Sequence, residues 1–404
     1  MKVAIVGGGA SGLVCAIEAA RKGHQVSVFE KNSKVGRKIL ATGNGKCNIS
    51  NQNITLSSYH GEQIHRIKEL LKHFDTATCK TFFSQLGLEM KEGEEGRLYP
   101  MSHQASSVVD LLLHEARLYG VVFHLQSEVK DISKHEEYFI LHVNEQTLMF
   151  DACVIATGSP AWKSLGSSES GYAFAKAFGL RVNEPFASLV QCVSDDEHLS
   201  LASGVKCDAV VELFIDQQKV QEAKGDVLFT PYGLSGLAIL ELSRKASLAL
   251  REHQKVHVIV DMFPSLSKEA LQNLLQKRLS FAKGKSLALW LEGIIPKKLA
   301  LFIIHREALL HVNDTSTLGT KELKKIVFAL KALRVKLVAT KGFESAEVCA
   351  GGVALDEMDT KTLMSLKCKN LYFCGEVLDV DGDCGGFNLH FAWASGYCVG
   401  KHIA

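Results

Sequence analysis

The first thirty residues limit what this chain can fold into more than any other stretch of it. Residues 2–6 form a short, β-branched apolar run, which is typical of a strand buried on both faces of a parallel sheet. A glycine-rich turn at 7–12, an apolar helical pattern at 11–22 and a second strand pattern at 24–30 follow directly. This order predicts an α/β fold with a dinucleotide-binding turn at the edge of a parallel sheet.

Gly7, Gly9 and Gly12 stand in the spacing GxGxxG, and each has a separate predicted role. Gly7 permits the tight turn, Gly9 lets the backbone approach a pyrophosphate, and Gly12 lets the helix pack closely on the strand. The pyrophosphate would lie at the positive end of the helix. The alternative interpretation is a glycine turn in an ordinary α/β core that binds no ligand.

Glu30 ends the second predicted strand, 18 residues after Gly12. That spacing is close to the ~20 residues expected of a carboxylate that binds a ribose 2′-hydroxyl. A turn without a ligand leaves Glu30 unexplained, which favours a dinucleotide. A carboxylate at this position disfavours a 2′-phosphate, so NAD and FAD both fit better than NADP.

Composition argues against several other classes of protein. The 404 residues, 47% of them hydrophobic, suffice for two or three domains. The 46 basic and 44 acidic residues leave a net charge of +2, which predicts neither a nucleic-acid nor a membrane partner. No apolar run approaches the ~20 residues of a membrane span. Eleven cysteines without a CxxC spacing predict a cytoplasmic protein with reduced thiols, no disulfide framework and no metal site.

The residue pattern changes along the chain in a way that predicts an insertion. Residues 31–58 form a polar, glycine-rich loop, and helices, a small antiparallel meander and a buried strand follow up to residue 158. Short strand patterns then occupy 188–264 and helical patterns 265–331, before a strand pattern returns at 335–340. The middle third is therefore predicted to be a β domain that carries a helical piece.

The C-terminal segment bears on the choice between NAD and FAD. A buried strand at 370–374 leads into Gly375 and Glu376, and a glycine loop leads into a helix at 389–400. A flavin needs contacts beyond the pyrophosphate, whereas NAD does not require the end of the chain to return to it. Glu376 could bind ribityl hydroxyls, and the helix start at 385–388 could stabilise negative charge on a reduced flavin. FAD is therefore the predicted cofactor.

Five blocks of sequence carry a resemblance to a known family. They are GGGASGLVCAI (7–17), VGRKILATGNGKCN (35–48), ATGSPAW (156–162), GDVLFTPYGLSG (225–236) and most of the stretch 349–396. Together they resemble the BaiN-like, aminoacetone-oxidase-like NAD(P)/FAD-dependent oxidoreductases along nearly the whole chain.

This resemblance implies an α/β fold with a Rossmann-like FAD-binding domain, an inserted β-barrel-like domain and a small helical domain. Residues 1–187 and 342–404 would form the discontinuous FAD-binding domain. Residues 188–264 and 332–341 would form the β-barrel-like domain, and residues 265–331 the helical one.

The resemblance also implies a set of FAD contacts. Beside the glycines, the contacts to the pyrophosphate and adenosine would come from Ala10, Ser11, Glu30, Val129, Ala156, Thr157 and Gly158. Contacts along the ribityl chain and the ring would come from Arg37, Lys38, Asn44, Cys47, Asn48, Glu376, Gly386, Phe387 and Asn388. Lys31 and Gly375 complete the predicted set. The family's acidic position is Glu376 here, and its contact is expected to be shifted by one methylene group.

The predicted protein is an FAD-dependent oxidoreductase that passes a hydride between flavin and a small-molecule substrate and is re-reduced by NAD(P)H. No second GxGxxG follows a strand, so nicotinamide would dock transiently against the flavin. The alternatives are an FAD-dependent oxidase of an amine or ketone and a non-catalytic flavin-binding sensor. A disulfide reductase is disfavoured because Cys47 lacks a neighbouring thiol, and a tRNA-modifying enzyme because the net charge shows no basic footprint.

Two loops, at 97–103 and 230–233, are predicted to line the substrate pocket. Tyr232 could act as an acid, although a buried, hydrogen-bonded tyrosine is commoner. The sequence therefore predicts no catalytic residue, and it predicts no oligomeric state.

Overall fold

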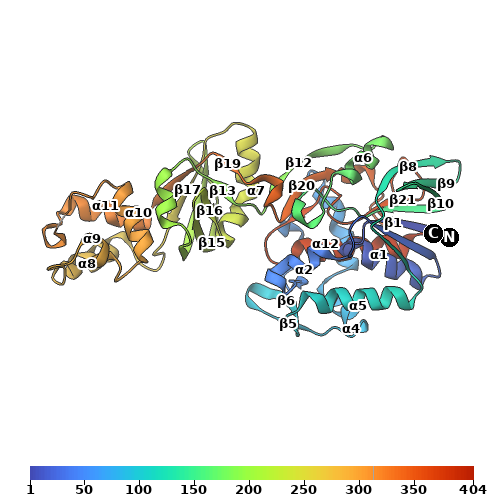
Figure 1. Cartoon of the computed structure of the whole chain (residues 1–404), viewed down its shortest axis with the longest axis horizontal. Helices are drawn as coiled ribbons and strands as arrows, with labels where there is room; N and C mark the ends of the chain where they lie inside the picture. The colour runs from blue at the N-terminus through green and yellow to red at the C-terminus, as the bar shows by residue number, and fades with distance from the viewer. Residues whose placement is uncertain (313) are drawn as a thin grey trace. The chain divides into compact units, whose positions relative to one another are not determined.

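The computed structural model describes residues 1–312 and 314–404, and the chain forms two compact units (Figure 1). Unit one consists of residues 1–186 and 343–404, and unit two of residues 187–342. A further division of unit two into a β domain and a helical domain stays a prediction.

Unit one is built around a five-stranded parallel sheet in the order β21-β11-β1-β2-β7. Strands β11 and β1 in the interior of this sheet are apolar and buried on both faces, except for the exposed Lys2 at the start of β1. The chain runs outwards from β1 through β2 to β7 and then returns to the other side of β1, at β11. Such a reversal is the point at which open α/β sheets bind ligands. The strands are β1 (Lys2–Val6), β2 (Gln25–Glu30), β7 (Val122–Leu125), β11 (Ala152–Ile155) and β21 (Leu371–Phe373).

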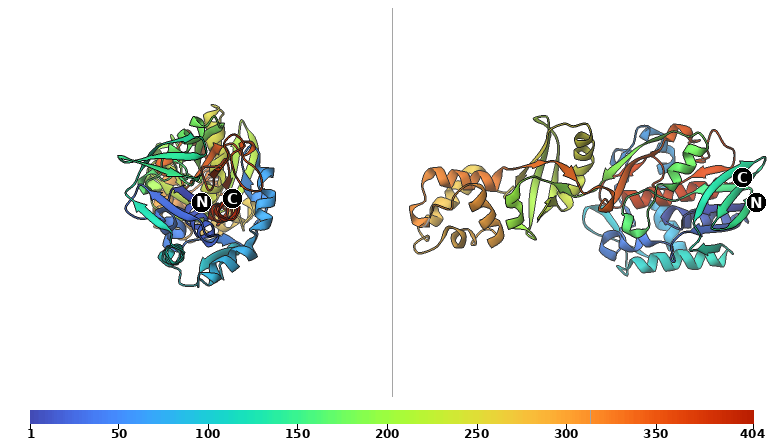
Figure 2. Two further views of the ribbon diagram at one scale, coloured as in Figure 1. Left: turned by 90° about the vertical axis from the view of Figure 1, so that its right-hand side faces the viewer. Right: turned by 45° about the horizontal axis from the view of Figure 1, so that its top comes forward.

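Two helices from opposite ends of the chain, α1 (Ala10–Arg21) and α12 (Phe387–His402), pack on each other in unit one. Their backbones come close because α12 presents glycines: a β-carbon on Gly396 would collide with the carbonyl oxygen of Ser11. The chain termini also lie side by side (Figures 1 and 2). There the ammonium group of Lys22 donates a hydrogen bond to the carbonyl oxygen of Ile403, at 2.9 Å.

Smaller elements surround this framework. An antiparallel meander of β8, β9 and β10 is inserted before β11, as predicted. The predicted loop at 97–103 instead contains β6, which pairs with β3 and β5. The strands are β3 (Ser50–Asn51), β4 (Tyr59–His60), β5 (Met90–Glu92), β6 (Arg97–Pro100), β8 (Val129–His135), β9 (Tyr138–Val143), β10 (Gln146–Phe150), β12 (Val182–Ser188), β20 (Val348–Val353) and β22 (Asp381–Gly382). The helices are α2 (Arg37–Ala41), α3 (Lys68–His73), α4 (Thr76–Gln85), α5 (Ala105–Leu118) and α6 (Ser170–Ala177).

Unit two contains a seven-stranded sheet whose neighbouring strands are antiparallel, in the order β18-β17-β14-β15-β16-β13-β19. The two outermost strands in this order, β18 and β19, are separated in the chain only by Val338. One stretch of chain therefore pairs with both ends of the sheet, which curves the sheet into a barrel-like form. The strands are β13 (Cys192–Val193), β14 (Lys206–Ile215), β15 (Gln218–Thr230), β16 (Gly233–Ser235), β17 (Val256–Asp261), β18 (Leu333–Leu337) and β19 (Ala339–Thr340).

The helices of unit two fall into two groups. Helix α7 packs on the sheet, and it begins at Leu237, directly after β16 and Gly236. The other four helices gather at one end of the sheet (Figure 2) and share one hydrophobic core with it. The helices are α7 (Leu237–Arg251), α8 (Lys268–Leu279), α9 (Leu287–Leu291), α10 (Lys297–Arg306) and α11 (Thr320–Lys331).

Candidate functional site

The glycine turn after β1 has the geometry that a dinucleotide site requires. A β-carbon on Gly7, whose φ is 111°, would collide with the carbonyl oxygen of Ala156. A β-carbon on Gly12 would collide with the carbonyl oxygen of Gly7, because helix and turn are in direct contact. At Gly9, by contrast, a β-carbon would meet nothing within 4 Å. The turn thus leaves open space at the glycine that a pyrophosphate would approach.

The start of α1 is suited to an anion. No side chain caps this helix end, and its first turn, which includes Ala10 and Ser11, has no acidic residue. No side chain of the first turn therefore neutralises the free backbone N–H groups or the positive end of the helix dipole. The Ser11 hydroxyl donates to the carbonyl oxygen of Cys374, at 3.3 Å, and holds the helix start to the end of β21.

Glu30 lies at the end of β2 and is only 8% exposed. Its Oε2 accepts the Gly8 N–H at 2.9 Å, and its Oε1 accepts the backbone N–H of Asn32 at 2.9 Å and its Nδ2 at 2.6 Å. A carboxylate has about four lone-pair positions, so these three bonds leave room for a ribose hydroxyl. Glu30 therefore holds the glycine turn in place and keeps one acceptor position in reserve.

Lys31 and Arg37 lie beside Glu30. The guanidinium of Arg37 donates to Oδ1 of Asn32 at 2.8 Å and to the carbonyl oxygen of Ser164 at 3.3 Å. The ammonium of Lys31 lies 3.5 Å from the carbonyl oxygen of Ser167. Arg37 is thus linked, through Asn32, to the predicted ribose end of the site.

Lys38 and Glu376 form an ion pair with an N–O distance of 3.0 Å. The other oxygen of Glu376 accepts the N–H of Cys349, at 3.0 Å. Gly375, just before it, packs so closely on Ser11 that a β-carbon would collide with the serine hydroxyl. The end of β21 therefore brings a carboxylate and a lysine together beside the start of α1.

The loop at 44–48 packs against the start of α12. Asn44 and Cys47 both have left-handed backbone conformations, with φ values of 54° and 59°. Cys47 is fully buried, and burial raises the pKa of its thiol to about 12, so the group is protonated at neutral pH. The buried Oδ1 of Asn48 accepts no hydrogen bond from the described residues, and a β-carbon on Gly386 would come within 2.8 Å of it.

The start of α12 is the second uncapped helix end of the site. Its N-cap is Gly386, with φ 101°, and its first turn has no acidic residue. The Asn388 side chain is engaged with the preceding loop: its Oδ1 accepts the Gly382 N–H and its Nδ2 donates to the Gly382 carbonyl, both at 2.8 Å. Phe387 is 8% exposed. A ligand at this end would therefore meet the backbone more than these side chains.

The remaining predicted residues lie at two further strand ends of unit one. Ala156 donates its N–H to the carbonyl oxygen of Val6, at 2.9 Å, and so continues β11 beside β1. Thr157 and Gly158 follow, and a β-carbon on Gly158 would meet nothing within 4 Å. Val129 is buried at the first position of β8.

The predicted residues therefore gather at the ends of β1, β2, β11 and β21, whose carboxyl ends lie at one edge because the strands are parallel. This arrangement fits FAD: two uncapped helix starts, open space at Gly9, a carboxylate with a spare lone pair and an unpartnered buried amide oxygen are present. Binding of FAD by these particular residues stays a prediction. Sequence reasoning missed the roles of Asn32 and Cys349. The position of Asn32 just after Glu30 was a usable signal, whereas nothing local marked Cys349.

The two loops predicted to line a substrate pocket belong to different units. In unit two the Thr230 hydroxyl donates to the carbonyl oxygen of Gly233, at 2.9 Å, and the Lys341 ammonium lies 4.6 Å from the centre of the Tyr232 ring. In unit one the ring of His103 lies 6.0 Å from that of Tyr99. A role for these loops in substrate binding stays a prediction.

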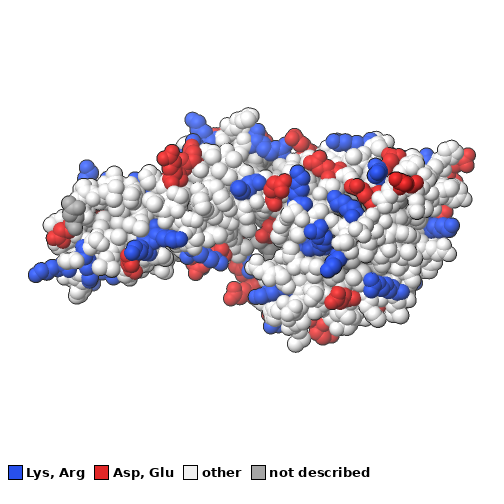
Figure 3. Space-filling view, in the orientation of Figure 1, with Lys and Arg blue, Asp and Glu red and all other residues white. Residues whose placement is uncertain are grey.

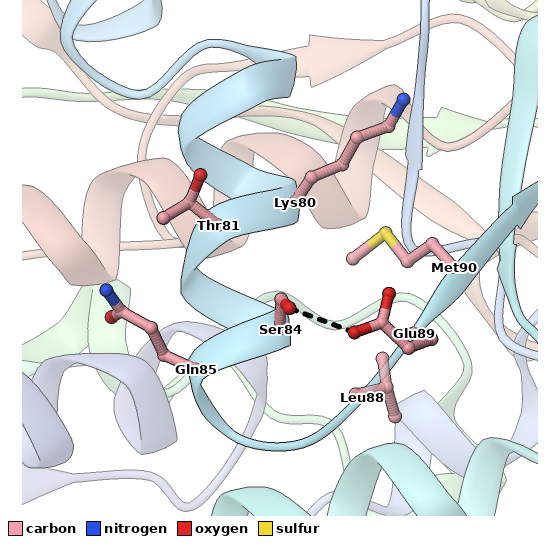
Figure 4. Close-up of a pocket in the computed structure, with 7 residues that line it drawn as sticks. All are labelled: Lys80, Thr81, Ser84, Gln85, Leu88, Glu89 and Met90. Carbon is pink, nitrogen blue, oxygen red and sulfur yellow. Dashed lines mark hydrogen bonds between the residues drawn. The ribbon is translucent and has the colours of Figure 1, made fainter.

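A pocket of about 470 Å³ lies between α4 and β5 (Figure 4). It is lined by Lys80, Thr81, Ser84, Gln85, Leu88, Glu89 and Met90. Ser84 donates its hydroxyl to Glu89 at 3.0 Å, and none of the predicted FAD contacts is among the lining residues. This pocket is therefore separate from the strand-end site.

Two features that other functions would require are missing from residues 1–312 and 314–404. These residues contain no group of three or more His, Cys, Asp or Glu side chains placed to hold a metal ion. They also contain no helix that is both long and apolar enough to cross a membrane.

A Rossmann-like parallel sheet with these strand ends is typical of dinucleotide-binding proteins. Residues 1–402 match the family described as HI0933-like protein Rossmann domain, so the chain belongs to this family. It is 36% identical to the 3-dehydro-bile acid delta(4,6)-reductase of Clostridium scindens, over 100% of this chain and 99% of the relative. It is 30% identical to the ribosomal RNA dihydrouridine synthase of Haemophilus influenzae, over 99% of this chain and 98% of the relative.

Solved structures show the same fold. The 3-ketosteroid-delta4-(5alpha)-dehydrogenase of Rhodococcus jostii RHA1 matches with a TM-score of 0.50 and 14% identity, over 99% of this chain and 96% of that one. The 3-ketosteroid delta1-dehydrogenase of Sterolibacterium denitrificans also has a TM-score of 0.50, with 12% identity, over 100% of this chain and 99% of that one. The family match and the whole-length similarity to a reductase confirm the predicted FAD-dependent oxidoreductase. The prediction of no nucleic-acid partner stays open, because one relative is named for ribosomal RNA.

Proposed function

We propose that this protein reduces a carbon–carbon double bond that is conjugated with a carbonyl group. The observation that carries the proposal is the whole-length similarity to two relatives, one named as a bile acid reductase and the other as a dihydrouridine synthase. A 3-dehydro-Δ(4,6) bile acid contains a ketone conjugated with two double bonds. Dihydrouridine is uridine whose ring double bond, conjugated with a carbonyl, has been saturated. The two names therefore describe the same bond change on different substrates.

FAD, when bound and reduced by NAD(P)H, would supply the hydride chemistry that saturates the double bond. The chain's residues would hold the cofactor. The α1 start and Gly9 would bind the pyrophosphate, Glu30 the adenosine ribose, and Glu376 the ribityl chain. The uncapped start of α12 would face the pyrimidine edge of the ring and favour negative charge there.

NAD(P)H is the proposed reductant, and it would dock transiently. The similarity to a reductase supports this choice over the FAD-dependent oxidase of an amine or ketone, and over a flavin-binding sensor. A small-molecule enone is the first candidate substrate, because the relative named for a bile acid is 36% identical. A uracil base in RNA is the second, supported by the 30% identity to a ribosomal RNA dihydrouridine synthase.

The test is an anaerobic reaction of the FAD-loaded protein. NADH or NADPH should bleach the flavin absorbance, and a 3-oxo-4,6-diene steroid should then restore it and gain two mass units. The saturated 3-oxo steroid serves as the control, and it should leave the flavin reduced. Bleaching by neither nicotinamide would contradict the proposed reductant. Bleaching that is reversed by oxygen, but neither by the dienone nor by uridine-containing RNA, would favour the oxidase.

A further inference from the structure

Residues 270–291 of unit two carry positive charge and no negative charge. They contain four Lys and Arg residues and no Asp or Glu residue, and they span most of α8, the loop that follows it and α9. Lys277, Lys283 and Lys285 are exposed, and none of the three forms an ion pair within the described part of the chain. Basic side chains are visible over the helices of unit two in the space-filling view (Figure 3). The charge of these three lysines is therefore available to an anionic partner.

Large apolar side chains are exposed among these lysines. Phe281 is 71% exposed, the highest fraction of any large apolar side chain among the residues that the structure describes. Leu289 on α9 is 53% exposed, and Leu274 on α8 is also exposed. Leu274 and Lys277 share one face of α8, because they are spaced by three residues, and Phe281 follows just beyond the end of that helix. Exposed apolar and basic side chains therefore stand next to one another in this segment.

The fold holds Phe281 in its exposed position. Ala282, the next residue, is fully buried. The guanidinium of Arg278 donates to the carbonyl oxygen of Trp290 at 2.7 Å, and the Trp290 indole N–H donates to the carbonyl oxygen of Arg278 at 3.0 Å. These two bonds join the end of α8 to α9. The backbone on either side of Phe281 is therefore attached to the protein, while the ring itself is left outside.

An anionic lipid surface is the partner that fits this combination of side chains. Exposed Phe and Leu side chains enter the boundary between headgroups and acyl chains, and anionic headgroups attract the lysines beside them. No carboxylate in residues 270–291 would repel those headgroups. A nucleic acid would use the lysines and the Phe281 ring, but it would leave the exposed leucines without a role, because bases stack on aromatic rings.

We propose that residues 270–291 bind the surface of an anionic lipid bilayer, with Phe281 inserted below the headgroups and the three lysines among them. This contact goes beyond the reaction proposed above and does not depend on it. Each lysine near the bilayer surface contributes roughly fivefold in affinity, and insertion of the ring contributes roughly tenfold. The net charge of the whole chain does not show this local excess, which is why it predicted no membrane partner.

The test measures co-sedimentation of the full-length, FAD-loaded protein with lipid vesicles. Vesicles of phosphatidylglycerol and phosphatidylcholine in equal parts should bind the protein, and phosphatidylcholine vesicles should bind it at least about tenfold more weakly. The variant K277Q/K283Q/K285Q should lose roughly a hundredfold in affinity for the mixed vesicles. The control K68Q/K91Q/K176Q makes the same charge change at exposed lysines of unit one, and it should bind like the unchanged protein.

Two substitutions at residue 281 test the insertion of the ring. Phe281→Ala should bind the mixed vesicles roughly tenfold more weakly. The emission of Phe281→Trp should be quenched by mixed vesicles with brominated acyl chains, beyond any quenching of the unchanged protein. Leu118, which is exposed in unit one, provides the controls: Leu118→Ala should bind normally, and Leu118→Trp should show no added quenching.

Equal weakening by the two lysine variants would overturn the proposal, because it would show an effect of net charge alone. An absence of added quenching at residue 281 would overturn it, and so would tighter binding to polyuridylic acid than to the mixed vesicles. Should K277Q/K283Q/K285Q fail to fold, lysine acetylation of the unchanged protein replaces it. The mixed vesicles should then protect the three lysines, and an absence of protection would overturn the proposal.

Discussion

At the scale of single residues, the site depends on side chains that each perform two tasks. Glu30 accepts hydrogen bonds from Gly8 and Asn32 and keeps one acceptor position for a ligand. Glu376 pairs with Lys38 and also accepts the N–H of Cys349. The lysine and glutamate are partly exposed, so their attraction contributes little to stability. Their effect is to determine where charge lies beside the predicted ribityl chain.

Replacing Glu30 by alanine should weaken FAD binding. The loss of a hydrogen bond to a charged group costs about 1.5–3 kcal/mol, which corresponds to roughly ten- to a hundredfold in affinity. A fluorescence titration of the apoprotein with FAD measures this change. Glu30→Gln keeps one acceptor oxygen, so its Kd for FAD should lie between those of the unchanged protein and of Glu30→Ala. The melting temperature of the apoproteins reports the separate loss of support for the glycine turn, and an unchanged Kd would show that Glu30 is not the ribose ligand.

At the scale of elements, α12 is the part of the chain that closes the site. It packs on α1 through glycines, and its start provides the second uncapped helix end. His390 anchors it: its Nδ1 lies 2.8 Å from the Ser50 hydroxyl of β3, and its Nε2 lies 2.9 Å from the carbonyl oxygen of Phe74. The imidazole is fully buried, and burial lowers its pKa from 6.5 to about 4.

This buried histidine should make the protein less stable in acid. Between pH 6.5 and about 4 the unfolded chain binds a proton at His390 and the folded chain does not. The free energy of unfolding therefore falls as the pH falls, by about 1.4 kcal/mol per pH unit and about 3 kcal/mol in all. Urea unfolding at pH 7 and pH 4.5 measures this loss. His390→Gln removes the titrating group and should show a smaller loss, so an identical loss in both proteins would contradict the assignment.

At the scale of the whole molecule, the two units differ in the residues that they contain. Every predicted FAD contact lies in unit one, whereas residues 265–331, with 12 basic and 5 acidic residues, lie in unit two. The net charge of +2 is the sum over both units, so it does not reveal the basic character of residues 265–331. The helical pattern had already marked residues 265–331 as one segment. Counting the charges of that segment alone would have revealed its basic character.

Unit one should bind FAD without unit two. In a variant in which a short Gly/Ser linker replaces residues 188–341, the strand ends and both uncapped helix starts are retained. We expect it to retain FAD through gel filtration but to lack dienone reduction, because unit two is absent. The flavin absorbance of the folded fraction gives the result. A folded but colourless variant would show that FAD binding requires unit two.

Local sequence patterns located several elements to within a residue or two, because burial on both faces or on one stripe leaves a period in the sequence. The predicted strand at 2–6 is β1, and the helical pattern predicted from 265 begins as α8, which the Ser267 hydroxyl caps. The short strand β6 was missed. Its pairing partners, β3 and β5, are themselves two or three residues long, so the pattern was too short to be read.

The sequence by itself determined the glycine turn, its strand and helix, the acidic residue at the end of β2, and hence a dinucleotide fold of this family. Only the tertiary structure decided how the two ends of the chain meet. Ser11 reaches Cys374, Lys38 reaches Glu376, and Gly396 lies against the backbone of Ser11. A turn is specified by the conformational limits of adjacent residues. Contacts between residues more than 300 positions apart arise from packing of the whole unit, and no local pattern encodes them.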